Sequence, residues 1–286
     1  MATMSAALRH LLLGAVVVLG MGAGSTADAA ARHHPRRPRT VDARVSAAFV
    51  MRGRIVTAVR VKGEHRGQRI TRQWTFTGEN CAGNICRQLL LTRERSAGQF
   101  DHLVLSRTGV GRYAGNGRFY APLECKGAIY PQGQVAPYRV TVAVTHAVTI
   151  QGIAFATALT ATYTNARRTD RTICPTGPSH DAATYSGTAS PGPSPPSAAF
   201  SAAVPPGSDS ATFTSTSTPG GDQSPITGFA WNFGDPTSGP ADAATGPQAA
   251  HIFTAPGTYT VSLTVTDANG LTTTQSQQVV VPAPPG

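Results

Sequence analysis

The segment at residues 258–267 constrains the fold of this chain more than any other. Its apolar side chains Tyr259, Val261, Leu263 and Val265 alternate with threonine and serine. Because successive side chains of a β-strand point to opposite faces, this period of two predicts a strand with one buried face. Similar alternation recurs elsewhere, Gly and Pro number 30 and 22, and charged residues make up only 13% of the chain. We therefore predict an all-β protein rich in turns, without long salt-bridged helices.

The N-terminus has the pattern of a secretory signal peptide. Arg9 precedes an apolar run at residues 11–21, and Ala27-Asp28-Ala29 supplies small residues for cleavage. We expect residues 1–29 to be removed and residues 30–40, which are basic and broken by proline, to form a flexible arm. An uncleaved N-terminal anchor is the alternative. No later apolar stretch is long enough to cross a bilayer, so we expect a secreted protein, extracellular or associated with the cell wall.

Four cysteines lie in the part of the chain that would be exported, namely Cys81, Cys86, Cys125 and Cys174. An even number in an oxidising compartment indicates disulfides, and four cysteines permit three pairings. We favour Cys81 with Cys86, closing a small loop, and Cys125 with Cys174, closing a long one. A zinc site is the alternative, but the spacing lacks the close cysteine pairs that structural zinc usually employs.

Residues 41–174 form the first predicted domain. Strand-like runs occupy residues 44–51, 55–61, 70–77, 88–93, 100–105, 117–120, 138–149 and 153–163, with turns such as 66–68 and 115–117 between them. About eight strands over this length are typical of an antiparallel β-sandwich or a small barrel, here stapled by disulfides. Residues 175–197 are rich in Pro, Gly and Ser, so we predict a linker there.

Basic and acidic residues are divided unequally along the chain. Residues 31–180 contain 23 basic and 7 acidic residues, whereas residues 181–286 contain 6 acidic residues and no Lys or Arg. A basic surface attracts polyanions when its charges cluster, so cell-wall glycan or another anionic polymer is an expected partner of the first domain. The alternative is compositional bias, because 22 of the 24 basic residues are arginine.

The C-terminal third carries a spaced set of aromatic, glycine and aspartate residues. The set comprises Trp231, Phe233, Gly234, Asp235, His251, Phe253, Gly257, Tyr259, Val261, Leu263, Val265 and Asp267. It resembles the polycystic-kidney-disease (PKD) domain family, whose hallmark is W-D-F-G-D followed by H-x-[YF]-x-x-x-G-x-Y-x-V-x-L-x-V-x-D. The resemblance covers residues 198–282 and leaves a tail at 283–286. It implies an immunoglobulin-like β-sandwich, generally non-catalytic, acting as a spacer or as a module that contacts protein or carbohydrate.

Within this resemblance the motif residues are expected to pack and turn the chain, with Trp231 in the core. Two positions depart from the family pattern. Asn232 replaces the first motif aspartate, and Asp235 is followed by Pro236 and a long insertion, which implies an extended loop. Asp235 and Asp267 are the only acidic pair suited to calcium. Calcium usually needs six or more oxygen ligands, and one pair of carboxylates supplies too few, so we predict no metal.

The first domain is loosely similar to secreted actinobacterial domains of unknown function. The shared pattern is Trp74, Phe76, Cys81 and Cys86, followed by an apolar strand at residues 89–91 and Arg93. No activity comes with this resemblance.

The sequence contains no recognised catalytic or nucleotide-binding motif, and no cofactor is expected. Glu64-His65 and His180-Asp181 place acid beside imidazole, but we assign the first to a turn and the second to the linker, both solvated. We assign Gly109–Gly115 to a hairpin turn. We expect a monomeric, non-catalytic binding or adhesion protein that contacts a polymer or an extracellular protein. The alternative is a secreted hydrolase with an unrecognised site in its first domain.

Overall fold

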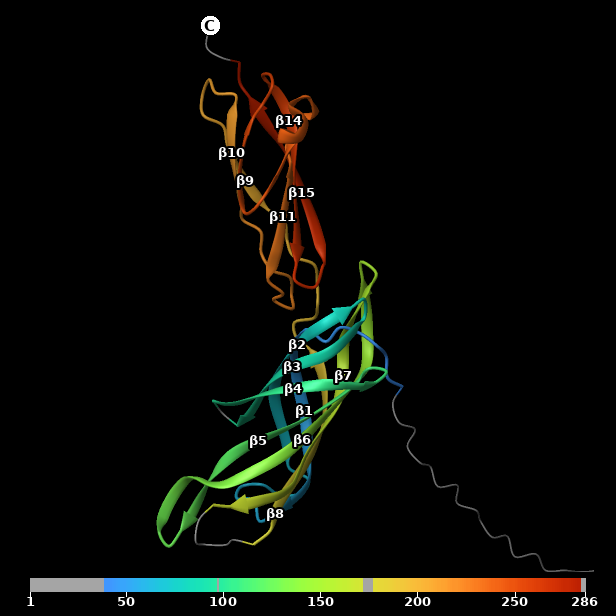
Figure 1. Cartoon of the computed structure of the whole chain (residues 1–286), viewed down its shortest axis with the longest axis vertical. Helices are drawn as coiled ribbons and strands as arrows, with labels where there is room; N and C mark the ends of the chain where they lie inside the picture. Colours follow the sequence, from blue (N-terminus) through green and yellow to red (C-terminus); the bar gives the residue numbers. More distant parts are fainter. Residues whose placement is uncertain (1–38, 97, 172–176, 284–286) are drawn as a thin grey trace, which may run out of the picture. The chain divides into compact units, whose positions relative to one another are not determined.

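The computed structural model describes residues 39–96, 98–171 and 177–283. These residues form two bodies of antiparallel β-strands and one short 3-10 helix (Figure 1). The all-β prediction is confirmed. Within the described ranges no helix is both long and apolar enough to cross a bilayer. The signal peptide and nearly all of the basic arm lie outside the described residues.

The first body is a closed barrel in which each strand pairs with its neighbours in sequence and β1 pairs with β8. This result decides between the sandwich and the small barrel that the sequence left open. The strands are β1 Ala47–Val59, β2 Arg69–Ala82, β3 Ile85–Ser96, β4 Gln99–Gly109, β5 Arg112–Cys125, β6 Ala128–Ile150, β7 Ile153–Asp170 and β8 Ser179–Ala189.

The barrel corrects two predicted boundaries. Residues 44–51 and 55–61 are not separate strands, because β1 runs through both. The eighth strand is instead β8, which lies inside the segment predicted to be a linker. Its composition is that of a linker, but Ser179, Asp181 and Ala183 alternate as buried positions along it. Polar residues that face a barrel interior do not give the apolar alternation by which strands are recognised.

The predicted turn at residues 115–117 is also wrong, because both glycines lie inside β5. A Cβ atom on Gly115 would stand 2.4 Å from the Val104 carbonyl oxygen, and one on Gly117 would stand 2.5 Å from the Tyr138 ring. Glycine in a strand therefore marks close approach of a neighbouring group here, and not a reversal of the chain. The reversal between β4 and β5 comes earlier, at Val110 and Gly111.

The barrel interior changes from apolar to polar along its length. On β3, Leu89 and Leu91 are fully buried, and the same inward face continues with Arg93, which is 4% exposed, and half-buried Arg95. The apolar part is filled by aromatic side chains, including an edge-to-face pair of Phe49 and Phe76 with ring centroids 5.6 Å apart. The apolar part of the interior forms the packed core that stabilises the barrel. The polar end is not filled by this core, so it has room for a cavity.

The second body is a β-sandwich of two antiparallel sheets, in the strand orders β13-β10-β9 and β12-β11-β14-β15. Its elements are β9 Phe200–Ala203, β10 Ser210–Ser215, β11 Ile226–Asn232, the 3-10 helix η1 Pro236–Asp242, β12 Ala243–Thr245, β13 Gln248–Ile252, β14 Gly257–Asp267 and β15 Thr272–Val281. The predicted extended loop after Asp235 is η1 and the short edge strand β12, which pairs with β11.

Trp231 lies in the core of the sandwich, as predicted, with 2% of its surface exposed. Its ring packs edge-to-face on Phe200 at 5.1 Å and against Phe213 at 5.6 Å. The indole Nε1–H donates to the Gly246 carbonyl oxygen at 2.9 Å, so the one polar atom of the side chain is satisfied. Aromatic burial of this kind, worth about 1.5–3 kcal/mol for each large side chain, holds the two sheets together.

Candidate functional site

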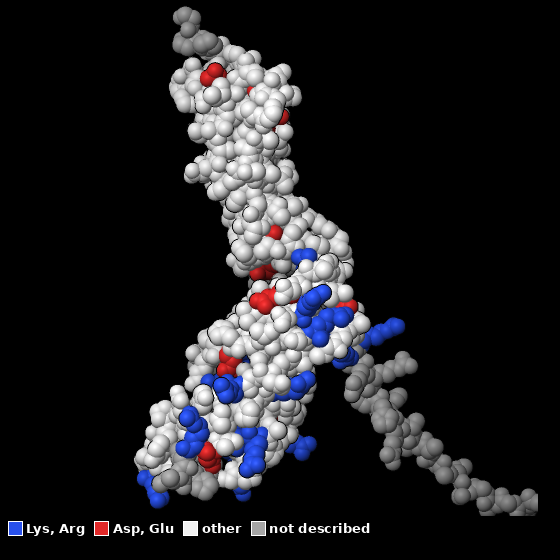
Figure 2. All heavy atoms as spheres, viewed as in Figure 1, with Lys and Arg blue, Asp and Glu red and all other residues white. Residues whose placement is uncertain are grey.

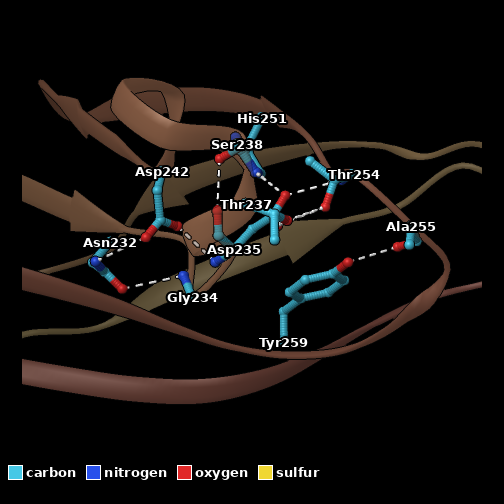
Figure 3. Close-up of polar contacts among 10 residues, drawn as sticks. All are labelled: Asn232, Gly234, Asp235, Thr237, Ser238, Asp242, His251, Thr254, Ala255 and Tyr259. Carbon is cyan, nitrogen blue, oxygen red and sulfur yellow. Dashed lines mark hydrogen bonds and ion pairs between the residues drawn. The ribbon is translucent and has the colours of Figure 1, made fainter.

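The aspartate of the family motif organises one end of the sandwich. Asp235 is 1% exposed and accepts hydrogen bonds from the Thr237 hydroxyl at 2.7 Å and from the Thr254 hydroxyl and amide at 2.8 and 2.9 Å (Figure 3). His251 Nε2 lies 3.2 Å from its second oxygen. Burial opposes ionisation of Asp235, but the bonds from Thr237, Thr254 and His251 outweigh it and lower its pKa to about 2.

These contacts join three elements, since Asp235 follows β11 while Thr254 follows β13 and Asp242 ends η1. The Asp235 amide donates to Asp242 Oδ1 at 2.6 Å, and Ser238 Oγ donates to the Asp235 carbonyl at 2.7 Å (Figure 3). Every polar atom of Asp235 is thereby used within the protein. The site is a structural clasp, in which the insertion after Asp235 is bound back onto the sandwich.

The structure does not bring Asp235 and Asp267 together. Asp267 pairs with Ile226 at the start of β11, whereas Asp235 follows Asn232 at its end. At about 3.3 Å per residue the two carboxylates lie at opposite ends of a seven-residue strand. Asp267 accepts the Leu271 amide at 2.8 Å and so shapes the turn between β14 and β15. The two residues do not form one calcium site, and no group of three or more metal-ligating side chains occurs within residues 39–96, 98–171 and 177–283.

The other motif residues pack or turn the chain. His251 stacks on Phe233 with centroids 4.4 Å apart and meets Phe253 edge-on at 4.6 Å. The Tyr259 hydroxyl donates to the Ala255 carbonyl at 2.7 Å, which fixes the turn that follows β13, while Val261, Leu263 and Val265 are fully buried. Gly257 begins β14, the strand that carries these residues.

One of the two expected disulfides is observed. Cys81 and Cys86 are bonded and occupy paired positions across the β2–β3 hairpin. Cys174, the expected partner of Cys125, lies outside the described residues. The observed bridge braces a hairpin and leaves no thiol for chemistry there.

The polar end of the barrel contains an open cavity with a volume of about 730 Å³. Cavities of this size accommodate small organic molecules. Among the described residues, six cationic side chains line it, namely Arg60, Lys62, Arg72, Arg93, Arg95 and Arg168. Four acidic side chains line it as well, namely Glu64, Glu94, Glu124 and Asp181. We call this space the arginine cavity.

Ion pairs and aromatic rings hold the inner arginines. Arg93 contacts Asp101 at 2.6 Å, and its guanidinium carbon stands 4.5 Å and 4.8 Å from the ring centroids of Tyr138 and Tyr163. Arg168 contacts Asp181 at 2.8 Å, with both side chains at least nine-tenths buried. Burial raises the pKa of Tyr138 to about 12, because the phenolate is poorly solvated there.

The cavity also corrects how the sequence assigned two acidic residues. Asp181 was predicted to be solvated in a linker, but it lies on β8 and is 5% exposed. Glu64 was predicted to be solvated in a turn, and it does lie in one, yet it lines the cavity; burial, followed by the nearby negative charge of Asp181, raises its pKa. No motif indicated these residues, although Leu89, Leu91, Arg93 and Arg95 at alternate positions were a signal that one inward face becomes charged.

The aromatic residues of the first domain divide between core and surface. Tyr113, Phe119 and Tyr138 are buried, whereas Tyr120 and Tyr130 are each 41% exposed. Core packing therefore accounts for Tyr113, Phe119 and Tyr138, and Phe119 also forms part of the cavity wall.

Comparison with known proteins identifies only the second body. Residues 193–281 match the family model described as PKD domain. A solved PKD1 domain of Vibrio anguillarum Epp is 27% identical, covers 32% of this chain and 98% of its own, and has a TM-score of 0.28. The PKD1 domain from the Vibrio cholerae metalloprotease PrtV is 28% identical, covers 31% and 98%, and has a TM-score of 0.26. No curated protein matches the chain. The family match and the motif geometry together show that the C-terminal sandwich of this chain is a PKD domain.

Proposed function

We propose that this chain is a non-catalytic extracellular binding protein whose barrel contacts an anionic polymer, with the PKD domain as a spacer or contact module. PKD domains often serve as adhesion or spacer modules in secreted proteins. The barrel is the better candidate for the polymer, because every Lys and Arg within the described ranges belongs to residues 39–171. In Figure 2 the basic side chains are spread over the barrel, and none is seen on the sandwich.

One group of exposed arginines carries the proposal. Arg52 and Arg54 project outward from β1, and Arg54 pairs directly with Arg69 on β2. Arg52 and Arg54 also border a shallow hollow with Thr184 and Ser186 of β8. None of the three arginines has an acidic partner among the residues that the structure describes. Like charges opposite one another on paired strands are destabilising. This cluster therefore lowers the stability of the unliganded barrel, and a bound polyanion would restore that stability.

Retention on immobilised heparin and on isolated bacterial cell walls tests the proposal, with heparin as a defined polyanion. The triple variant R52Q/R54Q/R69Q is expected to elute at clearly lower salt, with the slope of log affinity against log salt reduced by about 2 to 3 for three lost contacts. The control R87Q/R118Q/R139Q removes the same charge from exposed positions on β3, β5 and β6. Equal shifts in both variants would reject the cluster, and no retention of the wild-type chain on either matrix would reject polymer binding.

A hydrolase remains the second candidate, because Glu64 and Asp181 both line the arginine cavity and the Glu64 pKa is raised. A carboxyl group whose pKa is raised, close to a second carboxyl group, is a pattern of general acid catalysis. Glycosidase, esterase and peptidase substrates would be screened with the wild-type chain and with Glu64→Gln. Turnover that is lost in the variant would establish the enzyme, whereas equal background rates would exclude Glu64 as its acid.

A further inference from the structure

The inner wall of the arginine cavity carries more positive than negative charge. Three guanidinium groups, from Arg93, Arg95 and Arg168, share two carboxylates, from Asp101 and Asp181. Arg93 and Arg95 both contact Asp101, at 2.6 and 3.4 Å, so the ion pairs among the described residues leave three cations of this group with two carboxylates. A partly buried cation without a counter-charge is unfavourable, and a bound anion would relieve that cost.

Donor groups in the cluster are also left unused. The Nε–H groups of Arg93 and Arg168 are buried and have no hydrogen-bond partner among the described residues. Buried polar groups of native proteins are usually satisfied, and an orphaned donor costs free energy until a ligand or water supplies an acceptor.

Apolar and aromatic side chains form another part of the wall. Arg95 lies over the Phe119 ring, with its guanidinium carbon 4.1 Å from the centroid, and Tyr163, Tyr185 and Leu123 also line the space. A site of this kind combines cations that hold an acidic group with flat surfaces that cover an apolar body.

We propose that the arginine cavity binds one small organic anion, with its carboxylate, sulfonate or phosphate group near Arg95 and an apolar, preferably aromatic, body against Phe119 and Leu123. This site goes beyond the polymer contact proposed above, since it lies inside the barrel whereas Arg52, Arg54 and Arg69 project from its outer face. Either function can fail without the other.

The probe is 1-anilinonaphthalene-8-sulfonate, titrated into the full chain and followed by its fluorescence, with neutral N-phenyl-1-naphthylamine as the matched probe that lacks the sulfonate. We expect saturable binding of the sulfonate at one site for each chain and weaker binding of the neutral probe. Octanoate should displace the sulfonate at much lower concentration than inorganic phosphate, because phosphate brings charge without an apolar body.

Arg95→Gln is the decisive variant, because it removes the excess charge while Asp101 keeps Arg93 as its partner. It should weaken binding of the sulfonate about tenfold or more, the equivalent of one charge-assisted hydrogen bond, and leave the neutral probe within about twofold. Arg118→Gln, on the outer face of β5, should change neither. Ala121→Leu fills part of the cavity and should weaken both probes, with near-UV circular dichroism confirming that each variant is folded.

Three results would overturn the proposal. These are non-saturable sulfonate binding to the wild-type chain, equal effects of Arg95→Gln and Arg118→Gln, and undiminished binding of both probes to folded Ala121→Leu. Heparin retention of Arg95→Gln reports separately on the polymer contact, and it should stay close to that of Arg118→Gln.

Discussion

The closest test of the sandwich geometry is the substitution Gly234→Ala. Gly234 has φ of 69°, where an L-residue costs about 1–2 kcal/mol. A Cβ atom there would also stand 2.5 Å from the Thr260 carbonyl oxygen, which belongs to β14 and cannot move independently of the sheet. Overpacking of that kind costs about 1–3 kcal/mol, so the free energy of unfolding of the sandwich should fall by about 2–5 kcal/mol.

Gly246→Ala is the matched control, because Gly246 also has a positive φ, of 101°. A Cβ atom on Gly246 would have its nearest neighbour, the Gln248 carbonyl oxygen, at 3.7 Å, which is an ordinary contact. The free energy of unfolding of Gly246→Ala should fall only by the cost of the positive φ, without the cost of a steric clash. Urea unfolding would be followed through Trp231 in chains that also carry Trp74→Phe, since the two tryptophans divide between sandwich and barrel. If both glycine variants lose the same stability, the close approach of Gly234, which follows β11, to Thr260 of β14 is wrong.

Three other measurements test separate parts of the structure. Replacing Cys81 and Cys86 together by alanine should lower barrel stability by about 2 kcal/mol in urea, because the bridge closes a short loop, and an unchanged midpoint would contradict this. Although burial opposes it, hydrogen bonding holds the Asp235 pKa near 2, below its usual 3.8; the resulting stability is full above about pH 4 and is lost as pH falls through about 2. Asp235→Asn should therefore flatten this acid limb in a thermal-unfolding series. Burial raises the pKa of Tyr138 to about 12 and also raises that of Tyr163. The stability of the barrel is therefore full below about pH 10 and falls as pH rises through about 12. Absorbance at 295 nm should show that these tyrosines ionise at higher pH than free tyrosine, and complete ionisation by pH 11 in the folded protein would refute their burial.

The sequence was most informative where one strand face is apolar and the other polar. Burial of one strand face produces an apolar residue at every second position. This pattern allowed us to predict β14 from Tyr259, Val261, Leu263 and Val265, and to predict that Trp231 lies in the core. The Cys81–Cys86 pair was predictable for a related reason, since the two residues flank a short turn. These features depend on neighbours in sequence, and they were confirmed.

Sequence reasoning failed where a strand turns charged or small residues inward. Asp181 on β8 faces the cavity, and nothing local distinguishes its segment from a linker. Its burial follows from the pairing of β8 with both β1 and β7, which closes the barrel. The contact with Arg168 is likewise visible only after closure. Contacts between distant strands are set by barrel topology, and that topology is not encoded in any single stretch.

Compositional bias can explain the arginines on the outer face of the barrel but not those on its inner face. Outward arginines such as Arg118 fit a solvated face, and their number alone indicates no function. Arg93 and Arg168 cannot be explained in this way, because burying a guanidinium group is costly even when it is paired. Well-packed apolar residues would fill the same end of the barrel more stably, as Leu89 and Leu91 do further along β3. A barrel that instead keeps guanidinium groups, paired carboxylates and an open volume at one end is built at the expense of its own stability, and this is the pattern expected of a binding site.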